Sequence, residues 1–277
     1  MPVHGGGVRS AEADQSRAVP GWRRSRTPVL KADHEVVMTT LIIGATGGVG
    51  AALARRLHTR SESVFLAGRD EDALKSLADE LDAPCMACDV LDSAQLEAVV
   101  EAASEDGALK NLVFAAGSID LSPLRRLDRE TARASFELNA VSAAEALRVA
   151  EPHLKKNGGA AVVFSTVAVG QGFVSHAAIS MAKGAVEGLT RAVAAEWAPK
   201  ARINAIAPSL LDTGIAQPLL SNDKMRDGLA KMHALERLGG ADDAASLAAF
   251  LISEDAGWIT GQVFPVDGGR SRVRTKG

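Results

Sequence analysis

The sequence predicts an α/β fold, in which a doubly wound sheet of about seven parallel strands carries helices on both faces. From Leu41 onward, short apolar runs alternate with longer segments of helical periodicity. A glycine-rich segment follows the first apolar run directly. No linker rich in Pro, Gly and Ser interrupts the pattern that follows. Residues 38–277 are therefore expected to form a single domain.

Seven apolar runs have the length of a β-strand, and helical segments lie between them. Strands that alternate with helices are joined by right-handed crossovers, so the strands should be parallel. The expected strands are Leu41–Ile43, Val64–Ala67, Pro84–Ala87, Leu112–Ala115, Ala161–Phe164, Ile203–Ile206 and Val263–Val266. The expected helices cover Ala51–His58, Asp72–Glu80, Gln95–Ala103, Thr131–Leu154, Met181–Trp197 and Asp242–Ile252.

The composition is that of an ordinary globular protein, with 47% hydrophobic and 23% charged residues. A net charge of −3 gives no positive field that would attract nucleic acid or an anionic membrane. No apolar stretch is long enough to span a bilayer. We therefore expect a cytoplasmic protein whose partners include neither nucleic acid nor membrane.

Residues 1–37 differ from the rest of the chain. They contain Gly5-Gly6-Gly7 and the basic cluster Arg23-Arg24-Ser25-Arg26, without a sustained apolar period. This composition predicts a disordered N-terminal extension. A transit peptide is an alternative, although the segment contains four acidic residues, and a start site at Met38 is another. A secretory signal is not expected, because no apolar core segment is present.

The two cysteines, Cys85 and Cys88, have the C-x-x-C spacing of many metal and redox sites. They fall in an expected strand, where side chains three residues apart point to opposite faces. No second Cys or Cys/His pair completes a zinc ligand set. We therefore expect no metal site and no disulfide framework.

The first strand leads into Gly44-Ala45-Thr46-Gly47-Gly48-Val49-Gly50, and a helix follows. A glycine turn between a strand and a helix aims backbone N–H groups and the positive helix end at a pyrophosphate. Gly44 allows the tight turn, Gly48 the approach of the phosphates, and Gly50 close packing of the helix. No Lys-Ser/Thr follows, which excludes a triphosphate P-loop. The segment predicts a Rossmann-type site for a dinucleotide.

The end of the second strand indicates which dinucleotide binds. An acidic residue there would accept hydrogen bonds from the ribose hydroxyls of NAD(H). Gly68 occupies the position and Arg69 follows it, leaving space and a planar cation for a 2′-phosphate. Asp70 is expected to cap the next helix. NADP(H) is thus favoured over NAD(H), although a water-facing Arg69 is the alternative.

Further motifs follow the glycine turn in a fixed order. They are Cys88-Asp89-Val90, Leu112-Val113-Phe114-Ala115-Ala116-Gly117, Glu137-Leu138-Asn139-Ala140, the stretch from Asn204 through Pro208 to Thr213, and the stretch from Ile259 to Gly269. Together with the turn, they resemble those of the short-chain dehydrogenase/reductase family from Leu41 to Gly269. Within these motifs, two positions depart from the family pattern: Phe114 replaces an asparagine, and Ser209 replaces the glycine after Pro208.

The resemblance implies a catalytic Ser, a Tyr thirteen residues later and a Lys four residues after the Tyr. Counting back from Lys183 places Ile179 at the Tyr position and Thr166 at the Ser position. The chain contains no tyrosine at all, so none can substitute from elsewhere. Asn139 matches the family's catalytic asparagine. In this family Tyr transfers the proton, whereas Lys also binds the nicotinamide ribose.

A missing general acid costs roughly 10²- to 10⁴-fold in rate, whereas proximity and electrostatics usually supply more. The sequence therefore favours an NADP(H)-dependent oxidoreductase with an altered active site, acting on a small carbonyl or alcohol substrate. The proton could come from water held by Thr166, Asn139 and Lys183, from the substrate, or from His176, which has a suitable intrinsic pKa. A surface or capping role is the alternative for His176.

Two other functions stay open at this point. Ile179 also suits a redox-inactive NADP(H)-binding sensor or scaffold. A non-redox isomerisation or elimination is a third hypothesis, for which no particular residue argues.

The residues expected to contact the cofactor come from several of these segments. They are Gly44, Thr46, Gly48, Val49, Gly50, Arg69, Asp89, Val90, Ala115, Ala116, Gly117, Lys183 and Thr213, with Asn139, Thr166 and Lys183 as the catalytic set. The segment from Gly214 to Leu235 is expected to cover the substrate. The small residues of Ala182–Trp197 allow close helix packing, and the resemblance implies a homodimer or homotetramer formed through this region.

Overall fold

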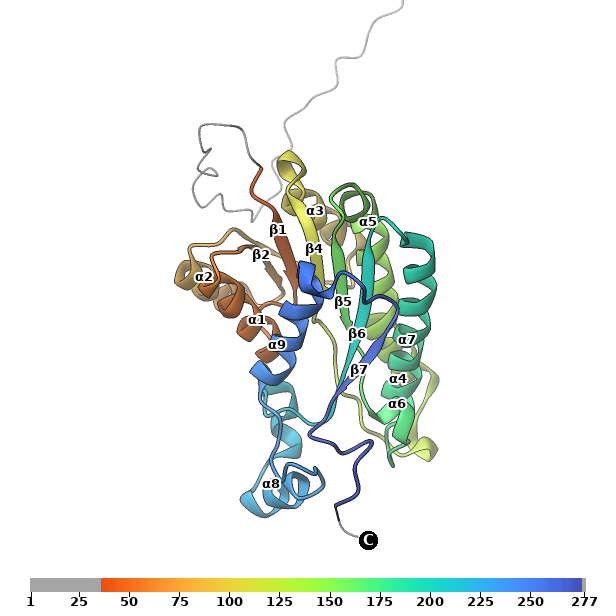
Figure 1. Cartoon of the computed structure of the whole chain (residues 1–277). Helices are drawn as coiled ribbons and strands as arrows, with labels where there is room; N and C mark the ends of the chain where they lie inside the picture. The colour runs from red at the N-terminus through yellow and green to blue at the C-terminus, as the bar shows by residue number, and fades with distance from the viewer. Residues whose placement is uncertain (1–35, 276–277) are drawn as a thin grey trace, which may run out of the picture.

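The computed structural model describes residues 36–275, and a parallel seven-stranded sheet runs through its centre (Figure 1). The strand order is β3-β2-β1-β4-β5-β6-β7, which confirms the expected doubly wound sheet. The disorder expected for residues 1–37 falls almost entirely outside the described residues. The strands are β1 Thr39–Ile43, β2 Ser63–Gly68, β3 Cys85–Ala87, β4 Leu109–Phe114, β5 Ala160–Phe164, β6 Arg202–Pro208 and β7 Val263–Val266.

Helices connect the strands in the expected alternation. They are α1 Gly48–Thr59, α2 Glu71–Leu81, α3 Ser93–Ala103, α4 Arg129–Phe136, α5 Ser142–Lys156, α6 Ala168–Gln171, α7 Ala177–Trp197, α8 Asp223–Ala230 and α9 Ala241–Ile252. Short helical segments are η1 Glu105–Gly107, η2 Leu124–Arg126, η3 Glu137–Val141, η4 Gly214–Leu219 and η5 Glu254–Ala256.

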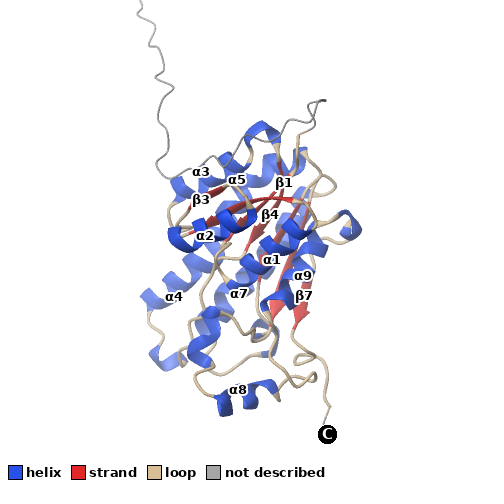
Figure 2. Ribbon diagram, turned by 90° about the vertical axis from the view of Figure 1, so that its left-hand side faces the viewer, coloured by secondary structure: helices blue, strands red, loops and turns tan. Residues whose placement is uncertain are grey.

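Both faces of the sheet are covered by helices (Figure 2). Side chains alternate along each strand, so Leu41 and Ile43 enter one core and Ile42 enters the other. The first core includes residues of α3, α5 and α7, and the second includes residues of α1, α2 and α9. Burial on both faces explains why the strand segments read as continuous apolar runs.

The strand order reverses direction between β1 and β4. In an open parallel sheet, such a switch point leaves a crevice beyond the carboxyl ends of the strands. The glycine turn follows β1, and Ala115–Gly117 follow β4, so the two segments flank this crevice. The topology therefore determines where the expected cofactor residues meet.

The expected helix over Thr131–Leu154 is interrupted, and this part of the prediction was wrong. The π-helical segment η3 separates α4 from α5. Within it, Asn139 Nδ2 donates to the carbonyl of Ser135, four residues earlier, at 2.9 Å. A side chain that uses this carbonyl competes with the helical backbone bond, which accounts for the wider turn at this point.

The two cysteines of the C-x-x-C pair lie on opposite faces of the sheet. Cys88 is buried in the first core, whereas Cys85 packs against the second. Burial, with nearby Asp89 and Asp92, raises the pKa of the Cys88 thiol to about 12. Within residues 36–275, no cluster of His, Cys, Asp and Glu could hold a metal ion, and no helix is long and apolar enough to cross a membrane.

Candidate active site

The glycine turn has the close contacts that require glycine. Gly44 has a φ of +85°, and a Cβ there would stand 2.6 Å from the backbone nitrogen of Ala116. A Cβ on Gly50 would stand 2.2 Å from the Gly44 carbonyl oxygen. Helix α1 begins at Gly48 without a side-chain cap. Its first N–H groups therefore remain available for an anion such as a pyrophosphate.

Besides Ala116, the structure brings two further separated segments onto this turn. A Cβ on Gly48 would lie 2.6 Å from Thr213 Cγ2, so Thr213 sits over the start of α1. A Cβ on Gly68 would lie 3.2 Å from the hydroxyl of Thr46. Segments expected to bind one cofactor thus converge on the β1–α1 turn.

Arg69 lies at the end of β2, next to this convergence, and its side chain is exposed. Within residues 36–275 its guanidinium has no hydrogen bond or ion pair to the protein. Asp70 accepts a hydrogen bond from the backbone of Ala73 at 3.0 Å, which confirms its expected capping role. Arg69 is therefore available to an anionic ligand, whereas Asp70 is not.

Asp89 and Val90 follow β3 and differ in what they can contact. Asp89 is half-buried, and its Oδ1 accepts from the backbone of Leu91 at 3.1 Å. The side chain of Val90 is buried in the first core. Only the backbone of Val90 can therefore face a ligand, while the Asp89 carboxylate retains free acceptor sites.

A polar cluster lies beyond the end of β4, around the buried Asn139. The backbone of Ser118 donates to Asn139 Oδ1 at 3.1 Å, and Asn139 Nδ2 donates to the hydroxyl of Ser118 at 3.1 Å. Ser118 in turn donates to Asp120 at 2.7 Å. A Cβ on Gly117 would stand 2.6 Å from Asn139 Oδ1. Sequence reasoning did not identify Ser118, because no motif marks a partner that only the η3 turn brings into contact.

Lys183 projects from α7 toward the same cluster. Its Nζ atom would lie 3.3 Å from a Cβ on Gly117. The residue is buried, and desolvation lowers the pKa of its ammonium to about 8. Among the described residues, none accepts a hydrogen bond from Nζ. A buried cation without a partner is costly, so this position fits a ligand that supplies hydroxyl acceptors, such as a ribose.

The remaining catalytic positions lie in the loop after β5 and on α7. Thr166 is half-buried, and its hydroxyl donates to the Pro208 carbonyl at 3.4 Å and accepts from the backbone of Ala168 at 3.3 Å. Ile179 is buried one helical turn before Lys183 and offers no proton. The site therefore keeps the hydroxyl and the ammonium of the expected set but lacks its acid.

His176 occupies the N-cap position of α7 but makes no capping hydrogen bond. Its Nδ1 pairs with the carbonyl of Val174 at 2.8 Å, and its ring meets the edge of Phe173 at 5.3 Å between centroids. The capping alternative is therefore wrong. The half-buried imidazole is held by its own loop and keeps Nε2 available.

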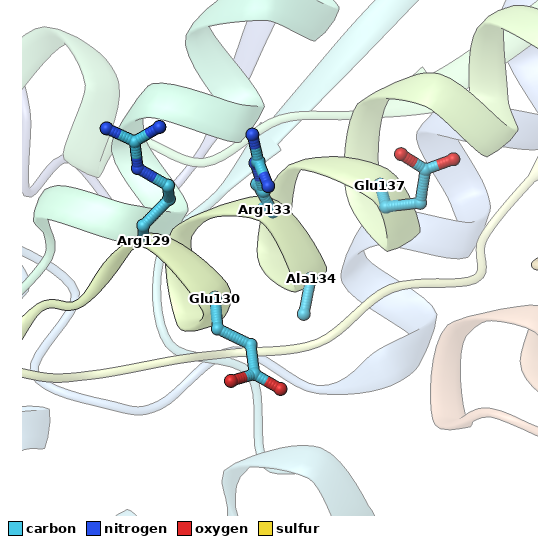
Figure 3. Close-up of a pocket in the computed structure, with 5 residues that line it drawn as sticks. All are labelled: Arg129, Glu130, Arg133, Ala134 and Glu137. Carbon is cyan, nitrogen blue, oxygen red and sulfur yellow. The ribbon is translucent and has the colours of Figure 1, made fainter.

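A groove of about 540 Å³ lies on the outer surface of α4 and η3 (Figure 3). Its lining is Arg129, Glu130, Arg133, Ala134 and Glu137, and all five are exposed. None of them belongs to the converging segments described above. The groove is thus separate from the candidate active site.

Comparison with known proteins gives a consistent result. Residues 44–271 match a family model described as enoyl-(acyl carrier protein) reductase. Tropinone reductase-like 3 of Erythroxylum coca is 31% identical over 236 residues, which cover 83% of this chain and 91% of that protein. Short-chain dehydrogenase/reductase SDRA of Arabidopsis thaliana is 31% identical over 83% of this chain and 92% of its own.

A solved structure shows the same arrangement. The short-chain type dehydrogenase/reductase from Mycobacterium ulcerans superposes with a TM-score of 0.81 at 28% identity, covering 86% of this chain and 90% of that one. The similarity of the fold thus extends over most of both chains.

Proposed function

Because the chain belongs to the short-chain dehydrogenase/reductase family, and is an oxidoreductase for which this family implies a nicotinamide cofactor, we propose that it uses NADP(H). Its substrate is a small carbonyl or alcohol compound. The observation that carries the proposal is the buried ammonium of Lys183, which has no hydrogen-bond acceptor among residues 36–275 and lies beside Gly117.

The residues of the site would have different roles in cofactor binding and catalysis. When bound, the nicotinamide supplies or accepts hydride. Lys183 would hold the ribose hydroxyls, and the N–H groups at the start of α1 would hold the pyrophosphate. Thr166 would orient the substrate oxygen through its hydroxyl. Asn139 positions Ser118 and the loop after β4 through two hydrogen bonds, and a third, to the Ser135 carbonyl, holds its own amide in place. Ile179 contributes only apolar surface.

The preference for NADP(H) is supported by Arg69. Its exposed guanidinium, which pairs with none of the described residues, follows Gly68 at the end of β2, where a 2′-phosphate needs both space and positive charge. Asp70, the nearest carboxylate in sequence, is occupied as the cap of α2.

The test is a fluorescence titration of NADPH and NADH, followed by assays of cofactor consumption with a panel of carbonyl and alcohol substrates. We expect tighter binding of NADPH and stoichiometric turnover with some members of the panel. Ile179→Tyr should raise the rate of carbonyl reduction, whereas Ile179→Phe, which adds a ring without a hydroxyl, should not. Binding without any turnover would contradict the proposal and favour the redox-inactive sensor, which Ile179 also suits.

Association into a homodimer or homotetramer is part of the proposal. Large apolar side chains are exposed on and around η3 and α7, including Val141, Val174 and Met181. Light scattering coupled to size-exclusion chromatography would measure the oligomer, and Met181→Glu should dissociate it. A cytoplasmic location is proposed as well, and imaging of the tagged full chain would test it.

A further inference from the structure

We propose that Ser209 and His233 form a proton relay that serves the substrate oxygen in place of the missing tyrosine. The inference rests on the proposed function, because the relay would supply the proton donor that the missing tyrosine would otherwise provide. It concerns two residues that no motif assigned to catalysis.

The hydrogen bonds around His233 determine its tautomer. Its Nδ1 faces the carbonyl oxygens of Leu229 and Ala230 at 2.9 and 3.3 Å. Carbonyl oxygens can only accept, so Nδ1 carries the proton of the neutral ring. Nε2 is then an acceptor, and the hydroxyl of Ser209 donates to it at 2.9 Å. A hydroxyl bonded to an oriented imidazole is the arrangement that moves protons in many enzymes.

The pair is close to the catalytic positions. The Pro208 carbonyl accepts from the Thr166 hydroxyl at 3.4 Å and from the backbone of Val167 at 3.1 Å. Ser209 is the next residue, so its Cα lies within roughly 6 Å of the Thr166 hydroxyl. A substrate oxygen oriented by Thr166 is therefore within reach of Ser209, directly or through one water.

A second chain of contacts connects Ser209 to the start of α7. Arg270 Nη1 approaches the Ser209 hydroxyl at 3.4 Å, and the same guanidinium stacks on the Phe173 ring at 4.3 Å. Phe173 in turn contacts His176, which precedes α7. The relay thus lies on the same rim of the sheet as the helix that carries Ile179.

The pair also has an opening. Ser209 and His233 line a cleft of about 370 Å³ formed with Leu235, Val266 and Gly268, among others. His233 itself is 3% exposed, whereas Ser209 is partly accessible. In a proton relay the hydroxyl must be accessible to the substrate, while the base behind it can be buried. Ser209 and His233 are arranged in this way.

The charged groups around the pair are few. Arg270 lies at Ser209, and Asp267, the cleft residue after β7, is close enough to interact with His233. Arg237 and Asp243 line the same cleft but pair with each other at 2.7 Å. Neither Asp267 nor Asp243 forms a hydrogen bond with an imidazole nitrogen of His233, whose ring nitrogens pair with Ser209, Leu229 and Ala230.

The proton and the electrons balance as follows. In carbonyl reduction the substrate carbon takes hydride and its oxygen takes the Ser209 hydroxyl proton, while protonated His233 returns a proton to Ser209 from Nε2. In alcohol oxidation the order reverses, and neutral His233 accepts the proton. No further oxidant or reductant is needed beyond the nicotinamide of the proposed function.

The decisive test combines Ser209→Gly with Ile179→Tyr. Glycine is the residue that the family pattern has at position 209, so this variant should fold normally. We expect Ser209→Gly to lower kcat for reduction 10- to 100-fold in the Ile179 protein, and to change it less than 3-fold in the Ile179→Tyr protein. A purely structural role for Ser209 would give the same loss in both backgrounds.

His233→Gln is the second variant, with His58→Gln on the exposed surface of α1 as its control. We expect kcat for reduction to fall as in Ser209→Gly, whereas His58→Gln should leave it unchanged. The Kd for NADPH should stay within about 2-fold in each variant. In the protein without cofactor, ¹⁵N NMR should show His233 protonated at Nδ1, with a shift at Nε2 in Ser209→Gly.

Three outcomes would overturn the relay. They are a kcat within 3-fold of wild type in both variants, an equal loss with and without Ile179→Tyr, or a loss in His176→Gln instead of His233→Gln. Each of these leaves the proposed function standing, because turnover persists in the wild type. Absence of wild-type turnover with the whole panel would overturn both.

Discussion

Lys183 and Gly117 lie in contact between helix α7 and the end of strand β4, with 3.3 Å from the Lys183 Nζ atom to a Cβ placed on Gly117. The same Cβ would stand 2.6 Å from Asn139 Oδ1. This amide cannot simply turn away, because three hydrogen bonds to Ser118 and Ser135 hold it. The site is therefore sensitive to a single added methyl group.

Gly117→Ala should lower the free energy of unfolding by about 1–3 kcal/mol, because Asn139 must break hydrogen bonds or shift. NADPH binding should weaken roughly 10-fold as Lys183 is displaced. Urea unfolding and fluorescence titration measure the two effects. Gly170→Ala is the control, since nothing lies within 4 Å of a Cβ there. Equal behaviour of the two variants would contradict the contact.

Gly48→Ala should weaken NADPH binding and destabilise the fold, because the new Cβ would lie 2.6 Å from Thr213 Cγ2. Thr213→Ser removes that methyl group, so it should recover part of the loss. A double-mutant cycle of unfolding free energies should give a coupling of about 1 kcal/mol or more. Gly184→Ala, whose Cβ would have an ordinary 3.8 Å contact, is the control. Additive effects would show that the two residues do not meet.

Lys183→Met should stabilise the protein without cofactor below about pH 8. Desolvation lowers the pKa of Lys183 from its ordinary value of 10.5 to about 8. Between these values the unfolded chain binds more protons than the folded one, so the unfolding free energy of the wild type rises with pH. The rise is roughly 3 kcal/mol, and Lys183→Met should lack it.

Urea unfolding at pH 7 and at pH 10 measures the difference, with Lys75→Met on the exposed face of α2 as the control. A variant less stable than the wild type at pH 7 would mean that the ammonium is solvated or paired. The same variant should bind NADPH more weakly, because the ribose loses its donor.

Arg69→Ala should raise the Kd for NADPH roughly 10- to 100-fold and leave the Kd for NADH within 2-fold. The loss should shrink as salt increases, because the guanidinium is exposed and its interaction is screened. Arg148→Ala, an exposed arginine on α5, should change neither constant. Equal losses for both cofactors would assign Arg69 to a different phosphate group.

The sequence by itself was sufficient for the fold class, the position of all seven strands and the glycine turn. These features are local: a strand buried on both faces reads as an apolar run, and a turn against a phosphate needs glycine at fixed positions. The observed strand ends differ from the expected ones by up to three residues. Strand β4, for example, begins at Leu109 rather than at Leu112, because the partners on neighbouring strands determine where pairing begins and ends. The absence of tyrosine was likewise evident from composition alone.

Only the tertiary structure decided which distant side chains meet. The η3 turn that joins Asn139 to Ser118, and the pairing of Ser209 with His233 across 24 residues, have no signature in local periodicity. Both depend on how helices and loops pack at the carboxyl edge of the sheet. Long-range contacts of this kind follow from packing and loop closure rather than from the pattern of neighbouring residues. The sequence therefore identified the missing tyrosine, whereas only the fold identified Ser209 and His233 as its candidate replacement.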